Sequence, residues 1–315
     1  TVGESGYIIR STDNGKNWDN VTSPTTNNLY GVIFGNDTLV GVGWSGNIVR
    51  STDNGINWDN VTSPTTNNLY GVTFGNDTFV GVGWSGNIVR STDNGINWNN
   101  VTSSTTNNLY GVTLGNDTFV GVGESGTIVR STDNGTTWDN ATSPTANHLM
   151  EVTFGNNTFV AVGYSGNILR STDNGTTWDN VTSPTANSLF GVGFGNNTFV
   201  AVGSSGNIVR STDNGSTWDN ATSPTANNLL QVVFGNNTLV AGGTYGNIVT
   251  TNNGITWANA TSSTTNHLYG VTLGNDTFVT VGESGYIIRS TNNGTNWNNV
   301  TSPTTNNLYG VTFGN

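Results

Sequence analysis

The chain has 315 residues, a formal net charge of −11 and no cysteine. Its eight Lys and Arg are outnumbered by 19 Asp and Glu, which argues against a nucleic-acid partner because phosphate binding needs a basic face. The lack of cysteine excludes disulfides and thiolate metal sites. No apolar run reaches the roughly 18 residues of a membrane-spanning helix.

A repeat of about 40 residues dominates the sequence. Residues 29–68 form one complete unit. The unit returns from Leu69, Leu109, Leu149, Leu189 and Leu229. The copy from Leu229 loses one residue in the stretch 246–251, and the pattern resumes from Leu268 and Leu308.

Each unit contains four short apolar runs that are separated by turn residues. In the first complete unit the runs cover 29–34, 38–43, 47–51 and 57–63, and a Pro- and Thr-rich loop follows. Short runs rich in Val, Ile, Phe, Thr and Trp, punctuated by Gly and Asn, are typical of strands joined by hairpins. Four strands in some 40 residues predict a blade of a β-propeller.

The two ends of the sequence predict a closed ring. Residues 1–3 match the second strand of a unit at 280–282, and residues 308–313 match a first strand. We therefore expect an all-β, eight-bladed propeller forming a single domain over 1–315, with Thr1 close to Asn315 and the last strand completing the N-terminal blade. An open solenoid is the alternative. Since the first residues already match mid-repeat, we expect a mature or trimmed chain without a signal peptide.

The third turn of each unit carries a recognisable motif. Residues 131–138 read S-T-D-N-G-T-T-W, which resembles the Asp-box (BNR) repeat of sialidases and sortilin-type receptors. The longer stretch G-x-x-G-x-I-x-R-S-x-D-x-G-x-T-W resembles the propellers of photosystem II assembly and stability factors. The resemblance implies a propeller and says little about chemistry. The residues in the motif positions are Asp13, Trp18, Asp53, Trp58, Asp93, Trp98, Asp133, Trp138, Asp173, Trp178, Asp213, Trp218, Trp257 and Trp297, with Asn252 and Asn292 expected in the Asp position of the last two copies.

The motif has a structural explanation that needs no ligand. Its Asp can accept hydrogen bonds from amides of its own turn, its Gly supplies a positive φ, and its Trp can pack against the neighbouring blade. A Ca²⁺ site at Asp13 and Asp19 is the alternative, although the spacing is not that of an EF-hand. We expect no metal and no cofactor.

No catalytic constellation is evident. Sialidase-like chemistry needs three converging Arg, but Arg10, Arg50, Arg90, Arg130, Arg170, Arg210 and Arg289 share one repeat position and are spread around the ring. We expect them to make one charge pair or carbonyl contact per blade. His148 and His267 replace a loop Asn and are expected to be ordinary substitutions. The prediction is that the protein is not an enzyme.

The repeat units differ most in residue type at one position, the x of V-G-x-S-G in the second turn. Antiparallel strands place this turn at the opposite end of the ring from the Asp motif, and Glu151 lies near it. An arc of aromatics and carboxylates suits a sugar or a cationic side chain, and neutral drift is the alternative. The candidate binding rim comprises Glu4, Trp44, Trp84, Glu124, Tyr164, Glu151 and Glu283.

N-x-[ST] sequons recur in two main slots of the repeat, and their Asn and Thr also suit turns. Together with scant Lys they suggest a secreted or cell-surface glycoprotein. The candidate N-glycosylation sites are Asn20, Asn36, Asn60, Asn76, Asn100, Asn116, Asn140, Asn156, Asn180, Asn196, Asn220, Asn236, Asn259, Asn275 and Asn299.

The sequence thus favours a non-catalytic extracellular or cell-surface module for binding, adhesion or scaffolding. A protein or glycan partner is expected on one face of the ring, and the regularity is compatible with a place in a larger surface assembly. An assembly factor is the first alternative and a sialidase-like glycoside hydrolase is the second.

Overall fold

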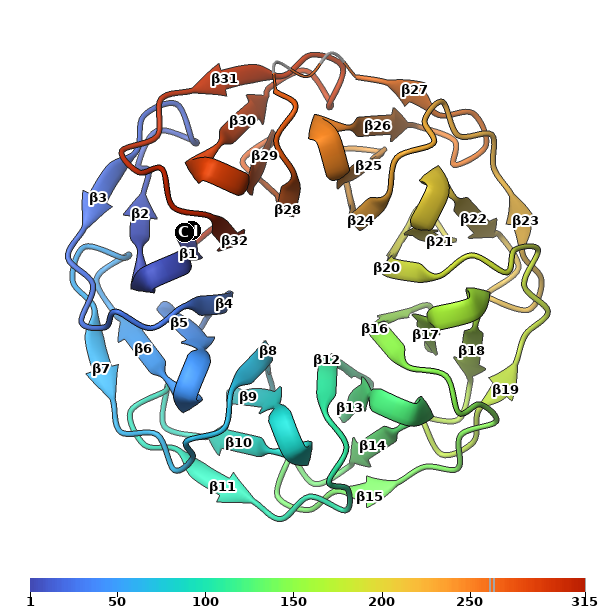
Figure 1. Cartoon of the computed structure of the whole chain (residues 1–315). Helices are drawn as coiled ribbons and strands as arrows, with labels where there is room; N and C mark the ends of the chain where they lie inside the picture. The colour runs from blue at the N-terminus through green and yellow to red at the C-terminus, as the bar shows by residue number, and fades with distance from the viewer. Residues whose placement is uncertain (261, 263, 315) are drawn as a thin grey trace.

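The computed structural model describes residues 1–260, 262 and 264–314. Eight four-stranded antiparallel sheets are arranged as blades around a central opening (Figure 1). Within each blade the strands follow one another in sequence order from the centre outward, except at the seam where the chain ends meet. The predicted eight-bladed closed propeller is therefore confirmed.

The first strands line the central opening, and the second strands are the most deeply buried part of each blade. The first strands are β4 (Leu29–Gly35), β8 (Leu69–Gly75), β12 (Leu109–Gly115), β16 (Leu149–Gly155), β20 (Leu189–Gly195), β24 (Leu229–Gly235), β28 (Leu268–Gly274) and β32 (Leu308–Gly310). The second strands are β1 (Val2–Gly3), β5 (Thr38–Gly43), β9 (Thr78–Gly83), β13 (Thr118–Gly123), β17 (Thr158–Gly163), β21 (Thr198–Gly203), β25 (Thr238–Gly243) and β29 (Thr277–Gly282).

The third and fourth strands are shorter, and the third strands are largely buried whereas the fourth strands are exposed. The third strands are β2 (Ile8–Arg10), β6 (Ile48–Ser51), β10 (Ile88–Ser91), β14 (Ile128–Ser131), β18 (Ile168–Ser171), β22 (Ile208–Ser211), β26 (Ile248–Thr251) and β30 (Ile287–Ser290). The fourth strands, on the circumference, are β3 (Asp19–Val21), β7 (Asp59–Val61), β11 (Asn99–Val101), β15 (Asp139–Asn140), β19 (Asp179–Asn180), β23 (Asp219–Asn220), β27 (Ala258–Asn259) and β31 (Asn298–Val300).

A single 3-10 turn joins the second and third strands of every blade. These turns are η1 (Glu4–Gly6), η2 (Trp44–Gly46), η3 (Trp84–Gly86), η4 (Glu124–Gly126), η5 (Tyr164–Gly166), η6 (Ser204–Gly206), η7 (Thr244–Gly246) and η8 (Glu283–Gly285). Together with the loops that precede the first strands they form one end of the ring, here called the rim end. The first hairpins and the Asp motifs form the other end, called the turn end. Among the described residues, no helix is long and apolar enough to cross a membrane.

Turn chemistry fixes the register of the first hairpin. Asn36 and Asp37 both have positive φ, 49° and 55°, as the two central residues of a type I′ turn require. Thr38 follows fully buried, and its hydroxyl donates to the carbonyl of Asn36 at 3.3 Å. The N-x-T pattern of this slot therefore has a complete explanation in turn geometry.

The hydrophobic core lies between blades. Trp58 packs with Val2 and Ile8 of the preceding blade, together with Leu29 and Val49 of its own. Trp98 and Trp138 repeat this arrangement around the ring. Each motif Trp therefore contacts the neighbouring blade as predicted, and a blade reaches its full burial only when the next blade is present.

Polar contacts clamp most of the blade interfaces at both ends. At the turn end, six Arg Nε groups donate to the carbonyl of a turn Asn in the next blade at 2.6–2.9 Å, as Arg10 does to Asn54. At the rim end, seven backbone amides of the 3-10 turns donate to a loop side chain of the next blade at 2.8–3.2 Å, as Ser5 does to Asn28. Six of the seven Arg thus make the predicted carbonyl contact, and within the described residues Arg210 does not.

The seam joins the N-terminal strands to β32, and both ends of the chain lie beside it (Figure 1). Val2 pairs with Gly310 and Gly3 with Leu308, and the Thr1 hydroxyl donates to the carbonyl of Gly310. Gly314 lines the same cavity as Thr1, whereas Asn315 lies outside the described residues. The strand expected over 308–313 ends at Gly310, because β1 offers only two residues for pairing.

Burial predicts that the motif Trp and the rim Trp contribute very differently to the stability of the protein. Trp138 is 4% exposed and fills an interblade core, so Trp138→Ala is expected to lower the free energy of unfolding by about 3–5 kcal/mol. Trp44 is exposed, and Trp44→Ala is expected to change the free energy of unfolding by less than about 0.5 kcal/mol. Urea unfolding of both variants measures this. Equal losses would contradict the interblade role.

Candidate functional site

The Asp motif closes its own turn through side-chain hydrogen bonds. The Ser11 hydroxyl donates to Asp13 and accepts from the amide of Gly15, both at 2.9 Å. Asp13 Oδ1 accepts the amides of Lys16 and Asn17, and the Trp18 indole donates to the carbonyl of Gly15. Gly15 has a φ of 76°. These bonds are those expected for a structural turn.

The hydrogen bonds also set the acidity of these carboxyls. Backbone and side-chain donation from Asn17 lowers the pKa of Asp13 to about 2. For Asp133, desolvation raises the pKa, but hydrogen bonds from the backbone and hydroxyl of Thr137 outweigh it and lower the value to about 2. The turns thus hold their carboxylates ionised at all ordinary pH values.

One expectation about the motif is wrong. In the seventh blade Asn253, and not Asn252, takes the Asp position, since its Oδ1 accepts the amides of Ile255 and Thr256. The deleted residue is therefore the turn Asn with positive φ, and the turn closes one residue shorter. In the eighth blade Asn292 holds the Asp position as expected and accepts the amide of Asn296 at 3.0 Å.

The Arg and His residues have structural partners. The clamping Arg side chains each reach a different blade interface, so they do not converge on one substrate. His148 Nδ1 accepts the amide of Ser125 at 2.9 Å, and His267 Nδ1 accepts that of Tyr245 at 3.2 Å. Both replace the loop Asn of other blades. An accepting Nδ1 carries no proton, so these bonds require neutral imidazoles.

The carboxylates predicted on the rim point inward and accept hydrogen bonds from the backbone. Glu4, Glu124 and Glu283 accept amides of the loop before the first strand of their own blade at 3.2, 3.4 and 3.1 Å. Ser204 and Thr244, in the same position, donate to the carbonyl of that loop. Much of the variation at this position therefore preserves a loop contact.

The aromatics at this position are different, because they are exposed. Trp44 is 49% exposed, Trp84 50% and Tyr164 40%. Trp44 and Trp84 therefore lie exposed on adjacent blades at the rim end. Sequence reasoning missed Tyr245, which is 63% exposed with a φ of 57° where seven blades carry Ser. The sequence signal that could have revealed Tyr245 is the replacement of the Ser that the other seven units carry in V-G-x-S-G.

Inside the rim turns, a cavity of about 320 Å³ occupies the mouth of the central channel. Each first strand has a bulge at its second residue, and this bulge aims a large side chain at the channel. Five consecutive blades place a Tyr there, with neighbouring ring centroids 5.6–6.1 Å apart. The tyrosine arc comprises Tyr269, Tyr309, Tyr30, Tyr70 and Tyr110.

The opposite wall of the mouth carries Glu151 and Gln231. Glu151 lies in the channel wall and not on the rim turns, which refines its expected place. Its Oε2 accepts the amide of Val192 at 3.0 Å, and Gly191 leaves room for it, since a Cβ there would lie 3.3 Å from that oxygen. Gln231 makes the same bond to Val271 at 2.8 Å. Burial raises the pKa of Glu151 to about 7, against the lowering effect of the Val192 amide.

Basic residues are confined to the turn end of the ring, which they share with the Asp residues. Every Glu of the chain lies at the rim end, namely Glu4, Glu124, Glu151 and Glu283. Every Lys and Arg lies at the turn end, either on the third strand beside the motif or, for Lys16, within it. The rim end therefore presents negative charge alone.

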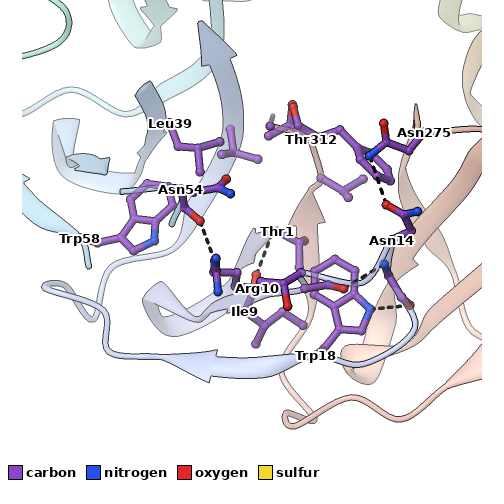
Figure 2. A pocket seen from close by; sticks show the side chains of 17 residues that line it. Thr1, Ile9, Arg10, Asn14, Trp18, Leu39, Asn54, Trp58, Asn275 and Thr312 are labelled. Atoms are coloured by element: carbon purple, nitrogen blue, oxygen red, sulfur yellow. Dashed lines mark hydrogen bonds between the residues drawn. The ribbon is translucent and has the colours of Figure 1, made fainter. Parts of the chain in front are cut away.

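A second cavity, of about 200 Å³, lies at the seam (Figure 2). It is lined by apolar groups that include Ile9, Trp18 and Phe313, and the Arg10–Asn54 bond crosses beside it. In other blades a second-strand residue such as Phe119 is fully buried in the equivalent space.

The sequon side chains face solvent. All the candidate Asn residues are exposed except Asn236, which is half-buried. Thr261 of the Asn259 sequon lies outside the described residues. Several amides of the outer-strand slot contact the preceding blade, as Asn140 does by donating to the carbonyl of Ser104 at 2.8 Å. Within the described residues, no group of three or more His, Cys, Asp or Glu could hold a metal ion.

Comparisons with known proteins support the fold. A model of the DUF6242 β-propeller domain matches residues 112–229. No curated protein matches the sequence. The computationally designed Ika8 protein superposes with a TM-score of 0.75 at 11% identity, covering 92% of this chain and 91% of that chain.

Two structures of YCF48 are also similar. YCF48 bound to a D1 peptide gives a TM-score of 0.68 at 19% identity, covering 93% of this chain and 98% of that chain. YCF48 from Cyanidioschyzon merolae gives 0.66 at 19% identity, covering 87% and 98%. At these identities the likeness shows a shared β-propeller fold.

The turn geometry predicts a specific dependence on acid. Because the pKa of Asp133 is lowered, its contribution to stability is complete above about pH 4 and is lost as the pH falls toward about 2. Asp133→Ala is expected to cost about 1 kcal/mol at pH 7, and Asp133→Asn less, since Asn292 holds the same position. Urea unfolding at pH 7, 4 and 2.5 tests this. An Asp133→Ala variant that loses as much unfolding free energy at pH 2.5 as at pH 7 would contradict this account.

Proposed function

We propose that the chain is a non-catalytic binding or scaffold module that captures a protein or glycan partner with its rim end. The observation that carries the proposal is the exposure of Trp44 and Trp84, which are additional to the motif Trp that is buried in seven of the eight blades. Exposed Trp on a rigid frame is the kind of residue that dominates binding energy. The cavity ringed by tyrosines opens at the same end.

The turn end is less suited to recognition. Its side chains are used in closing turns and clamping blades, and this pattern repeats around the ring. We include in the proposal that these turns are Asp boxes with a structural role, supported by the Ser, Asp, Gly and Trp contacts. We also propose an extracellular or cell-surface location, supported by the solvent-facing sequons.

An assembly factor is the second candidate. It has support in the similarity to YCF48, a propeller of the same general architecture that has been observed with a D1 peptide. Both candidates have peptide or protein capture in common, and the rim end would serve either.

The rim proposal predicts a loss of binding without a loss of stability. Glycan and peptide arrays probed with the Trp44→Ala/Trp84→Ala variant are expected to lose the wild-type signals by about ten-fold or more, with an unchanged Tm. Ile56→Ala/Ile96→Ala is the matched control, since both Ile are 55% exposed on the same two blades at the turn end. Binding that survives the Trp changes and fails in the control would contradict the proposal.

The location proposal predicts glycan on natively sourced protein. Intact-mass measurement before and after enzymatic removal of N-glycans should show mass above the 33.1 kDa chain that disappears on treatment. The outer-strand slot, represented by Asn20, is the expected site, because the hairpin sequons are fully explained by turn geometry. An unmodified native mass would contradict this proposal.

A further inference from the structure

We infer that the channel mouth is a binding site for one cationic side chain, a lysine or an arginine, of the partner. The inference rests on the proposed function, because the mouth opens within the rim. It adds the chemical class of the group that is recognised and the residues that recognise it.

The cavity has the shape and lining for a long side chain with a charged tip. Its volume of about 320 Å³ exceeds that of a single Lys or Arg side chain and is at the lower end for a ligand pocket. Five Tyr form one wall, and Met150 and Phe190 continue the aromatic and apolar surface on the other. Such walls accept the aliphatic stem, and aromatic rings attract a cation.

Glu151 supplies the counter-charge in its ionised form, and a bound cation favours that form over the neutral one that burial stabilises. One carboxylate oxygen is held by the amide of Val192, which orients the group. In the described part of the chain its second oxygen, Oε1, receives no hydrogen bond. A carboxylate with one oxygen anchored and one directed at a cavity can form a charge-assisted hydrogen bond with an ammonium or guanidinium.

The surroundings favour the same sign of ligand. The rim end carries Glu residues and no Lys or Arg, so a cation approaching the mouth meets no repulsion. An anionic ligand would meet Glu151 and the rim carboxylates instead. A neutral sugar could use the tyrosine arc but would not require a carboxylate, and this difference separates the two ligands experimentally.

The chain contains its own control for the key substitution. Gln231 occupies the equivalent position two blades away and makes the equivalent bond to a first-strand amide. Glu151→Gln therefore reproduces a side chain that this fold already accepts, and it removes the charge alone.

The test uses three capped tripeptides, N-acetyl-Gly-X-Gly-amide with X as arginine, lysine or citrulline, titrated calorimetrically into the whole chain at 0.15 M salt. Wild type is expected to bind the Arg or the Lys peptide at least about ten-fold more tightly than the neutral citrulline peptide. Glu151→Gln should abolish that preference. Glu124→Gln, which removes a rim charge outside the cavity lining, should change it by less than about two-fold.

Two results would overturn the inference. One is equal binding of the Arg, Lys and citrulline peptides by wild type, and the other is a Glu151→Gln variant that keeps the preference. The Trp44→Ala/Trp84→Ala variant separates this inference from the rim proposal, because the short peptides contact the mouth alone. Retained tripeptide preference in that variant supports the channel site even if array binding shows no dependence on the two Trp.

Discussion

The structure depends on the interlock between neighbouring blades. A four-stranded blade is a thin sheet with two faces to cover, and its motif Trp finishes packing only against the second and third strands of the blade before it. An Arg–carbonyl bond at one end and an amide–Asn or amide–His bond at the other fix the angle between blades. With eight blades the ring closes, and the inner edge strand of every blade faces the narrow central channel, where it is protected from pairing with another chain.

This constraint separates the two ends of the ring in what their residues are free to do. At the turn end, the Ser, Asp, Gly, Trp and Arg positions make specific contacts, and the replacements found there, Thr251 for Ser and Asn253 or Asn292 for Asp, keep the hydrogen bonds of the turn. At the rim end, the second turn needs only its Gly residues and a backbone bond, so the first residue of the 3-10 turn can be Glu, Ser, Thr, Trp or Tyr. Recognition residues at the rim end can therefore differ between blades without affecting ring closure. The basic residues lie only at the turn end, where the Arg side chains hold neighbouring blades together.

The repeat made the fold predictable, because 40-residue periodicity, hairpin signals and matching ends together leave few alternatives. The Asp turn was equally readable, since each of its bonds is local in sequence. The tyrosine arc was not, because its direction depends on a bulge that shifts the register after Leu29 and Leu69. The inward bonds of Glu4 and Glu151 join residues that are distant in sequence, and the shortened seventh turn has two possible alignments that only its hydrogen bonds distinguish.

The seventh blade offers the most direct test of the interlock. It carries Thr250 in the Arg position, and its shortened turn lacks the Asn whose carbonyl accepts Arg elsewhere; within the described residues Arg210 makes no such bond. Hydrogen exchange of the folded protein, followed by mass spectrometry, can compare β26 and β27 with β14 and β15, whose interfaces are clamped by Arg90 and Arg130. Loss of a charge-assisted clamp predicts amide exchange about ten-fold faster in the seventh blade. Equal protection of the two blades would contradict the claim that these clamps hold the ring together.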